Sequence, residues 1–153
     1  MVRVLFVCLG NICRSPMAEA VFAHKVKAAG LAAEISVDSA GTGHWHIGEP
    51  PHHGTRRILM SKRIEFDHKA RMLVASDLEK FDYVVTMDDE NLRNVQRMGR
   101  GSAKVVPFLT YAPELGLTEV PDPYFTGDYD ETFRLTDAAA EGLLVAIRKE
   151  HGI

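Results

Sequence analysis

The sequence is poor in cysteine and has no long apolar segment. Its two cysteines, Cys8 and Cys13, lie close together, so the chain lacks the disulfide framework typical of small secreted domains. We therefore expect a reducing, cytoplasmic location. No apolar run reaches the roughly 18 residues that a membrane span needs. The apolar stretch 4–9 also lacks the basic lead-in and cleavage site of a signal peptide, so we expect neither feature.

A strong excess of basic residues is also absent. The chain has 18 Lys and Arg residues against 21 Asp and Glu residues, which gives a net charge of −3. Nucleic-acid-binding domains usually show a basic excess or stripe, so we expect no nucleic-acid partner. With 153 residues, no internal repeat and no linker, the sequence predicts one domain over residues 1–153, large enough to bury its own core. We expect it to be a monomer.

Four stretches have the composition of β-strands. Residues 2–7 and 82–87 are nearly continuous runs of β-branched and aromatic residues, which is typical of strands buried on both faces. Residues 34–39 alternate in polarity, and residues 104–107 end at a proline, so both favour edge strands. Helical periodicity predicts helices at 16–29, 55–61, 77–80, 88–98 and 131–147, and residues 111–125 read as a Pro-rich loop.

Strands that alternate with helices predict an α/β fold with a parallel sheet. The two doubly buried strands belong in the middle, which gives the order 2-1-3-4 with helices on both faces, a single-domain three-layer fold. The chain then winds in opposite directions from the first and third strands. Ligands bind in the crevice that this arrangement opens at the carboxyl ends of the strands, where Cys8 would lie.

The segment C-L-G-N-I-C-R-S, residues 8–15, has the residue types of an anion-binding loop. Gly10 and Asn11 readily take positive φ values, which allows successive backbone N–H groups to point inward. Pro16 suits the first position of a helix, whose positive end would face the same loop. The guanidinium of Arg14 matches two oxygens of a phosphate. The loop therefore predicts a site for a tetrahedral dianion.

The positive field of such a loop would favour the thiolate form of Cys8. A thiolate that faces a bound phosphorus atom is a nucleophile suited to phosphoryl transfer through a covalent thiophosphate. Ser15 could donate a hydrogen bond to this sulfur when it has to leave. A cysteine at a strand end is most often a small buried apolar residue, but here it precedes a turn-prone loop, an arginine and a helix start.

Metal and nucleotide sites fit the sequence less well. The Gly-Lys-Ser/Thr ending of a nucleotide-binding P-loop is missing, and the C-x4-C spacing suits neither zinc nor a C-x-x-C redox site. Four histidines gather in the Gly- and Pro-rich stretch 40–54 without a recognisable ligand spacing, so we expect solvated loop there. These are His44, His46, His52 and His53. We expect no metal and no cofactor.

The segment C-L-G-N-I-C-R-S-P resembles the active-site loop of the low-molecular-weight protein tyrosine phosphatases. Four later blocks resemble family blocks in the same order, so the resemblance covers essentially the whole chain. They are S-A-G at Ser39–Gly41, D-H-K-A-R at Asp67–Arg71, V-T-M-D-D-E-N-L at Val85–Leu92 and D-P-Y at Asp122–Tyr124.

This resemblance implies a role for each loop residue and for several residues outside the loop. Cys8 would be the nucleophile, Arg14 would bind the phosphate and the transition state, and Asp122 would be the general acid. Asn11, Ser15, Ser39 and His68 would belong to the network that shapes the loop. The other residues expected at the phosphate are Leu9, Gly10, Asn11, Ile12, Cys13 and Ser15.

Physical reasoning supports a role for Asp122, Trp45 and Tyr124. A departing phenolate needs a proton, and the carboxylate that results can activate the water that hydrolyses the thiophosphate. Trp45 and Tyr124 are expected as pocket walls that hold a phenyl ring and reject the shorter phosphoserine and phosphothreonine. Asp88, by contrast, is expected to be a helix N-cap.

The sequence thus predicts metal-independent hydrolysis of protein phosphotyrosine and aryl phosphates. One alternative is an arsenate reductase on the same fold, although its thioredoxin-coupled form uses further cysteines downstream and none follows Cys13 here. Another is a non-catalytic phosphate-binding module.

Phe125 stands where the animal pattern has a second tyrosine, which removes that phosphorylation site. The proximity of Cys8 and Cys13 also suggests a peroxide-driven disulfide between them.

Overall fold

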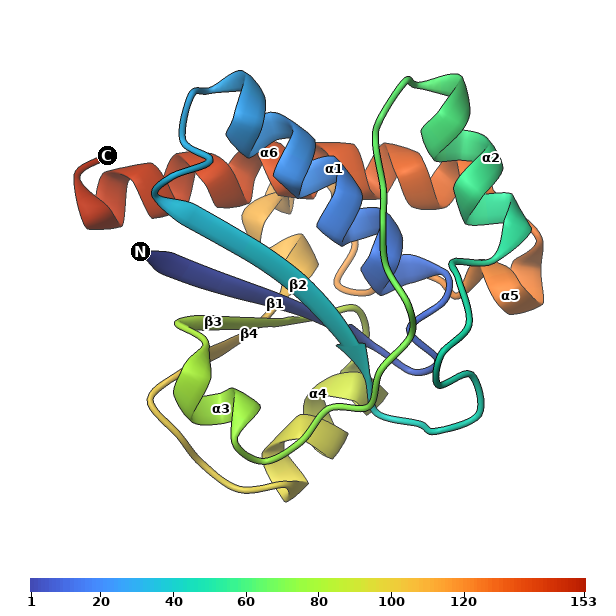
Figure 1. The fold of residues 1–153 in the computed structure, drawn as a ribbon, viewed down its shortest axis with the longest axis horizontal. Coiled ribbons are helices and arrows are strands. Elements are labelled where there is room, and N and C mark those ends of the chain that lie inside the picture. Colours follow the sequence, from blue (N-terminus) through green and yellow to red (C-terminus); the bar gives the residue numbers. More distant parts are fainter.

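A computed structural model describes all residues, 1–153, and its centre is a parallel four-stranded sheet (Figure 1). The strands are β1 (Val2–Cys8), β2 (Ile35–Gly41), β3 (Tyr83–Thr86) and β4 (Lys104–Pro107). Their order is β2-β1-β3-β4 and every pairing is parallel. The predicted single-domain α/β class and strand order are therefore confirmed.

The central strand β1 is buried on both faces because its side chains alternate between two cores. Val4 and Phe6 belong to the larger core, which α1 and α6 complete, whereas Leu5 and Val7 belong to a smaller core on the other face. Phe6 meets Phe22 of α1 edge-on, with ring centroids 5.6 Å apart. Such double burial explains why the strand reads as a continuous apolar run.

Helices cover both faces of the sheet (Figure 1). α1 (Arg14–Ala28) and α6 (Tyr129–His151) lie together on one side, with α2 (His53–Ser61) beside them, and α3 (Asp77–Lys80) and α4 (Asp89–Arg97) lie on the other. α5 (Pro123–Thr126) and the 3₁₀ turns η1 (Phe108–Tyr111) and η2 (Pro113–Leu115) connect β4 to α6. No helix has the length and apolar character that a membrane crossing requires.

Several boundaries differ from the sequence-based expectation. α1 begins at Arg14, two residues early, so Pro16 is its third residue. A proline is compatible with that position because the first N–H groups of a helix have no intrahelical acceptor. α6 begins at Tyr129, where the Asp128 carboxylate accepts a hydrogen bond from the Glu131 N–H. Residues 111–125 are not one continuous loop, because η2 and α5 interrupt them.

The carboxyl ends of β1 and β2 meet at the loop that follows Cys8. Cys8 pairs with Gly41, and the chain termini lie at the opposite end of the sheet (Figure 1). A side chain at Gly41 would place its Cβ 2.8 Å from the backbone oxygen of Leu9 and 3.1 Å from Asn11 Cβ. Glycine is thus required here so that β2 can lie directly against the loop.

Candidate active site

A pocket of about 440 Å³ opens above the end of β1. Cys8 lies at its base, and most of its lining is apolar. Eight of its ten lining residues were expected at the site from the sequence: Cys8, Leu9, Gly10, Ile12, Cys13, Trp45, Asp122 and Tyr124. The structure adds His46 and Phe125. A pocket of this size can hold one aromatic ring with its phosphate.

The loop 8–14 turns its backbone carbonyls away from its centre. The carbonyls of Cys8 and Leu9 accept hydrogen bonds from the N–H groups of Thr42 and Gly43, at 3.0 and 2.8 Å. The Ile12 carbonyl accepts from the His52 N–H at 2.7 Å. The N–H groups of four loop residues donate to no group of the protein: Leu9, Gly10, Ile12 and Cys13. Free N–H groups in a curved loop form an anion-binding nest.

The sulfur of Cys8 has two polar neighbours. The Ser15 hydroxyl lies 3.0 Å from Sγ, and the backbone N–H of Asn11 donates to Sγ at 3.3 Å. Both groups can stabilise a negative sulfur. Asn11 has a φ of 57°, as predicted, because this left-handed turn directs its N–H back to Cys8.

Gly10 does not share that positive φ, so this part of the expectation was wrong. The reason for a glycine here is close packing instead. A Cβ at this position would lie 3.1 Å from the imidazole of His46, which forms part of the pocket wall. The absence of a side chain therefore allows the His46 ring to approach the loop.

Arg14 lies beneath the pocket, at the first residue of α1, and is 2% exposed. One of its terminal nitrogens donates to Asp88 Oδ2 at 2.7 Å and to the Val120 carbonyl at 2.9 Å. The other lies 3.3 Å from Asp122 Oδ2. The Nε group is buried without a partner in the protein, so a donor remains free for an anion.

The pKa of Arg14 also reflects this acidic environment. Burial lowers the pKa of Arg14, but the nearby groups Cys8, Asp88 and Asp122 raise it by more than burial lowers it. The net result is a pKa above the usual value for arginine. The guanidinium therefore stays charged throughout the working range of pH.

Asp88 has two functions in the structure. Its Oδ1 accepts the Asn91 N–H at 2.8 Å, and the Asn91 side chain accepts the Asp88 N–H at 3.2 Å, which makes a reciprocal cap at the start of α4. Its second oxygen, Oδ2, is the one that binds Arg14. The cap was predicted, whereas the ion pair with Arg14 was not.

Asp122 is held at the pocket by the start of α5. Its Oδ1 accepts the Tyr124 N–H at 3.0 Å, so Oδ2 points toward Arg14. Pro121 and Pro123 flank it and restrict the backbone. Its side chain is 21% exposed, which leaves it accessible to a bound ligand.

Three aromatic side chains form an exposed rim around the pocket. Trp45, Tyr124 and Phe125 are 62%, 54% and 77% exposed. Trp45 stacks on His44 with ring centroids 5.3 Å apart, and Tyr124 meets Phe125 edge-on. Large apolar side chains left in water at a pocket mouth indicate a binding surface for another apolar group.

Asn11 connects the loop to a buried polar network. Its Nδ2 donates to the hydroxyls of Ser15 and Ser39, at 2.8 and 3.0 Å. Its Oδ1 accepts from His68 Nε2 at 2.7 Å and from the Arg71 N–H at 3.0 Å. All four hydrogen-bonding positions of the amide are used, so the side chain fixes the loop in one conformation.

Glu19 of α1 completes this network and was not identified from the sequence. It accepts from the Ser39 hydroxyl at 2.7 Å, and its Oε1 lies 3.1 Å from His68 Nδ1. Asp38 lies near the same imidazole, at 3.8 Å. Glu19, Asp38 and His68 are residue types that bind cations, but each already has a partner in the protein: Glu19 and His68 contact Ser39, and Asp38 pairs with Arg71.

A second support lies behind Cys13. Its Sγ is 3.5 Å from the Tyr129 hydroxyl, which is in turn 2.8 Å from His52 Nδ1. Since Nδ1 already accepts the Gly54 N–H, Tyr129 donates to it and the Cys13 thiol donates to Tyr129. The pKa of Cys13 is raised to about 12, mainly by burial, so the thiol remains protonated and can donate a hydrogen bond.

Nothing in the sequence pointed to this second support. Cys13 and Tyr129 are 116 positions apart, and His52 lay in a stretch expected to be solvated loop. The side chain of Thr55 adds a further contact, since its hydroxyl donates to the Cys13 carbonyl at 3.1 Å.

Comparisons with known proteins identify the family of the chain. Residues 3–152 match the family of low molecular weight phosphotyrosine protein phosphatases. The chain is 46% identical over 153 residues to the low molecular weight protein-tyrosine-phosphatase YfkJ of Bacillus subtilis, with 98% of each chain covered. The crystal structure of YfkJ superposes with a TM-score of 0.96 and covers 98% of this chain and 96% of that one.

A more distant solved structure is named for a different substrate. The Drosophila arginine phosphatase is 31% identical, with a TM-score of 0.90, and the match covers 95% of this chain and 97% of that one. The same fold therefore occurs in proteins named for two kinds of substrate, phosphotyrosine and phosphoarginine.

Proposed function

The chain belongs to the low molecular weight phosphotyrosine protein phosphatases, and on this basis we propose that it hydrolyses phosphotyrosine in proteins, and aryl phosphates, through a cysteinyl-phosphate intermediate. The observation that carries this proposal is the environment of the Cys8 sulfur. It lies at the base of an aromatic-rimmed pocket, in a loop with four free N–H groups, and within 3.3 Å of two hydrogen-bond donors.

In the first step the Cys8 thiolate attacks phosphorus. The S–P bond forms as the bond from phosphorus to the phenolic oxygen breaks, and protonated Asp122 gives its proton to that oxygen, so the product leaves as a neutral phenol. The loop N–H groups and Arg14 stabilise the charge on the equatorial oxygens. Asp88 and Val120 hold the guanidinium, which means that little reorganisation is needed on binding.

In the second step water hydrolyses the thiophosphate. The Asp122 carboxylate removes a proton from water, the oxygen of that water bonds to phosphorus, and the S–P bond breaks to release inorganic phosphate. The departing sulfur becomes a thiolate again. Ser15 donates a hydrogen bond to it from 3.0 Å, which stabilises this leaving group.

The lining of the pocket favours an aryl group. Leu9, Ile12, Trp45 and Tyr124 supply apolar surface, whereas a phosphorylated guanidinium would need further acceptors beside Asp122. Because Cys8 lies at the base of this pocket, the pocket also disfavours phosphoserine and phosphothreonine, whose side chains are shorter than that of phosphotyrosine. We therefore place phosphotyrosine ahead of phosphoarginine, the substrate type named for the Drosophila relative.

The two alternatives considered from the sequence have less support. An arsenate reductase of the thioredoxin-coupled kind needs further thiols, and Cys8 and Cys13 are the only cysteines. A module that only binds phosphate would need neither Asp122 at the pocket nor Ser15 beside the sulfur. Because both cysteines are free thiols and the chemistry needs a reduced Cys8, a reducing compartment such as the cytoplasm suits the protein.

A substrate panel tests the proposal. Purified protein is assayed without added metal, and with a chelator, on para-nitrophenyl phosphate and on peptides that carry phosphotyrosine, phosphoserine, phosphothreonine or phosphoarginine. We expect turnover of the aryl phosphates alone, unchanged by the chelator, and none in Cys8→Ser. Preferred turnover of phosphoarginine, or retained activity in Cys8→Ser, would contradict it.

A further inference from the structure

The exposed side of α2 and the residues just after it carry a concentrated positive charge. Residues 53–63 contain four basic side chains and no acidic one. The other 142 residues hold 14 basic and 21 acidic side chains, so the rest of the chain is acidic. The basic side chains are Arg56, Arg57, Lys62 and Arg63; we refer to them with His53 as the basic face of α2.

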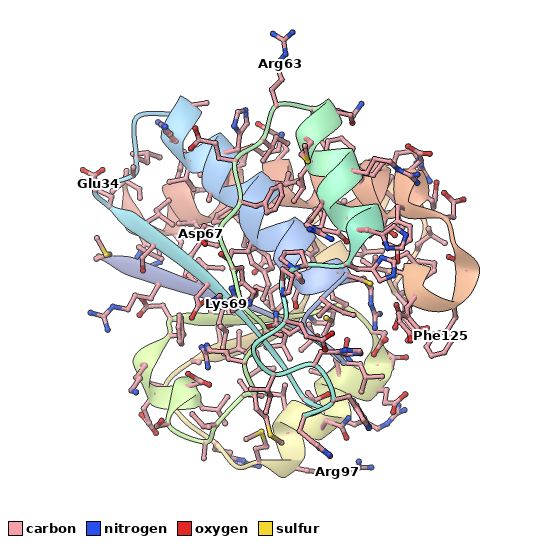
Figure 2. All side chains as sticks on the ribbon, turned by 45° about the vertical axis from the view of Figure 1, so that its right-hand side comes forward. Glu34, Arg63, Asp67, Lys69, Arg97 and Phe125 are labelled. Carbon is pink, nitrogen blue, oxygen red and sulfur yellow. The ribbon has the colours of Figure 1, made fainter.

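The basic face of α2 has no acidic partner within the protein. Its members are exposed, and none of them forms an ion pair with a carboxylate. Lys62 lies over the ring of Phe133, at 5.1 Å from its centroid. Figure 2 shows Arg63 extending away from the protein beyond the end of α2. Cations that form no ion pair within the protein are free to interact with an acidic ligand.

The basic face begins at the wall of the pocket. The His52 ring lies 6.0 Å from the ring of Tyr124, a pocket residue, and 4.2 Å from that of His53, the first residue of α2. Burial lowers the pKa of His52, and the nearby charges of His53, Arg56 and His46 lower it further. The positive surface is therefore continuous with the substrate site.

A shallow hollow of about 380 Å³ extends along this face. It is lined by His53, Arg56, Arg57, Met60 and Phe66. From His53 to Met60 the helix rises about 10 Å, at roughly 1.5 Å per residue. An extended peptide advances about 3.3 Å per residue, so about three substrate residues match this length. Met60 is 68% exposed and adds an apolar contact among the charges.

We propose that the basic face of α2 binds acidic residues next to the phosphotyrosine of a protein substrate, so that the enzyme prefers acidic phosphopeptides. This inference rests on the proposed function, because it needs phosphotyrosine in the pocket. Carboxylates of the flanking residues would then meet Arg56 and Arg57. An anionic membrane would also attract these cations. The basic face adjoins the pocket wall, however, and this position matters for a peptide whose phosphotyrosine lies in the pocket but not for a lipid surface.

The test compares three phosphotyrosine peptides that differ only in acidic, neutral or basic flanking residues, with para-nitrophenyl phosphate in parallel. We expect the wild type to prefer the acidic peptide, and this preference to shrink at high salt. In Arg56→Gln/Arg57→Gln, kcat/KM for the acidic peptide should fall roughly three- to tenfold, while the neutral peptide and para-nitrophenyl phosphate stay unchanged. In Arg56→Glu/Arg57→Glu the preference should shift to the basic peptide.

The matched control is Arg97→Gln/Arg100→Gln, which changes the net charge equally on the opposite side of the molecule, where Figure 2 shows Arg97. An equal loss in this control, or no preference in the wild type, would overturn the proposal. The proposal would also be overturned if Arg56→Gln/Arg57→Gln lost binding to phosphatidylserine vesicles but kept the wild-type preference for the acidic peptide. Failure of the wild type to hydrolyse para-nitrophenyl phosphate would overturn the proposed function itself, whereas hydrolysis without peptide preference would refute only this inference.

Discussion

The guanidinium of Arg14 lies 3.3 Å from the carboxylate of Asp122, although the two residues are 108 positions apart in the chain. This pair joins the group proposed to bind phosphate to the group proposed to protonate the leaving oxygen. A phosphate bound at Arg14 would therefore place its leaving oxygen close to Asp122.

Replacing Asp122 with alanine should reduce kcat/KM, which reports formation of the intermediate, in a way that depends on the leaving group. Without the general acid we expect a loss of roughly 100- to 10,000-fold for phosphotyrosine, whose phenolate is a poor leaving group. For para-nitrophenyl phosphate the loss should be smaller, because that phenolate leaves without a proton. Steady-state kinetics on a series of aryl phosphates measures the effect. A uniform loss across the series would argue against a proton donor at this position.

Replacing Asp88 with asparagine separates its two functions. Asparagine caps helices about as well as aspartate, so α4 should be retained, but the charge that holds Arg14 is lost. We expect at least a roughly tenfold fall in kcat/KM, about 1.4 kcal/mol, and weaker inhibition by inorganic phosphate. Asp88→Ala should in addition lose about 1 kcal/mol of stability through the cap. If Asp88→Asn bound phosphate as well as the wild type, the ion pair would not position Arg14.

Removal of the Tyr129 hydroxyl should affect the site through Cys13. Tyr129→Phe keeps the stacking on His52, at 5.2 Å between centroids, but loses both hydrogen bonds, with an expected cost of about 1 kcal/mol. A lower kcat/KM should accompany this cost because the loop is less well held. Tyr83→Phe is the control, since its hydroxyl bonds Glu150 and His151 far from the pocket. Equal effects of both variants on activity would rule out a specific role.

The stability of the protein should depend on pH through Cys13. Its pKa is raised by burial from 9.0 to about 12, so between these values the folded state binds more protons than the unfolded state. This contribution is therefore complete below about pH 9 and is lost as the pH rises toward 12, at no more than about 1.4 kcal/mol per pH unit. Urea unfolding of wild type and Cys13→Ala under reducing conditions measures it. If the difference in the free energy of unfolding between wild type and Cys13→Ala stayed constant from pH 8 to 10.5, this would contradict a protonated, buried Cys13.

The sheet could be predicted because its strands differ in burial. β1 and β3 are apolar along most of their length because both of their faces are covered, and this property alone placed them in the centre. The position of Cys8 at the crevice followed directly. Helix ends were less accurate, because α1 begins inside the loop at Arg14 and the N-terminal residues of a helix need no intrahelical acceptor.

Contacts between distant segments could not be predicted from local pattern. The sequence indicated that Asp88 caps a helix, since cap and partner lie three residues apart, but its pairing with Arg14 depends on how β1 and β3 align. Tyr129 reads as an ordinary residue near a helix start, and only the packing of α6 against α2 brings it to Cys13. His46 likewise reaches the pocket wall because Gly10 has no side chain.

The most direct measurement is the identification of the phosphorylated residue during turnover. Asp122→Ala, in which hydrolysis of the intermediate should be slow, is mixed with para-nitrophenyl phosphate, quenched in acid and analysed by mass spectrometry of its peptides. We expect one phosphoryl group on Cys8, and none in Asp122→Ala/Cys8→Ser. Phosphate on another residue, or release of para-nitrophenol by Cys8→Ser at the wild-type rate, would contradict a cysteinyl-phosphate mechanism.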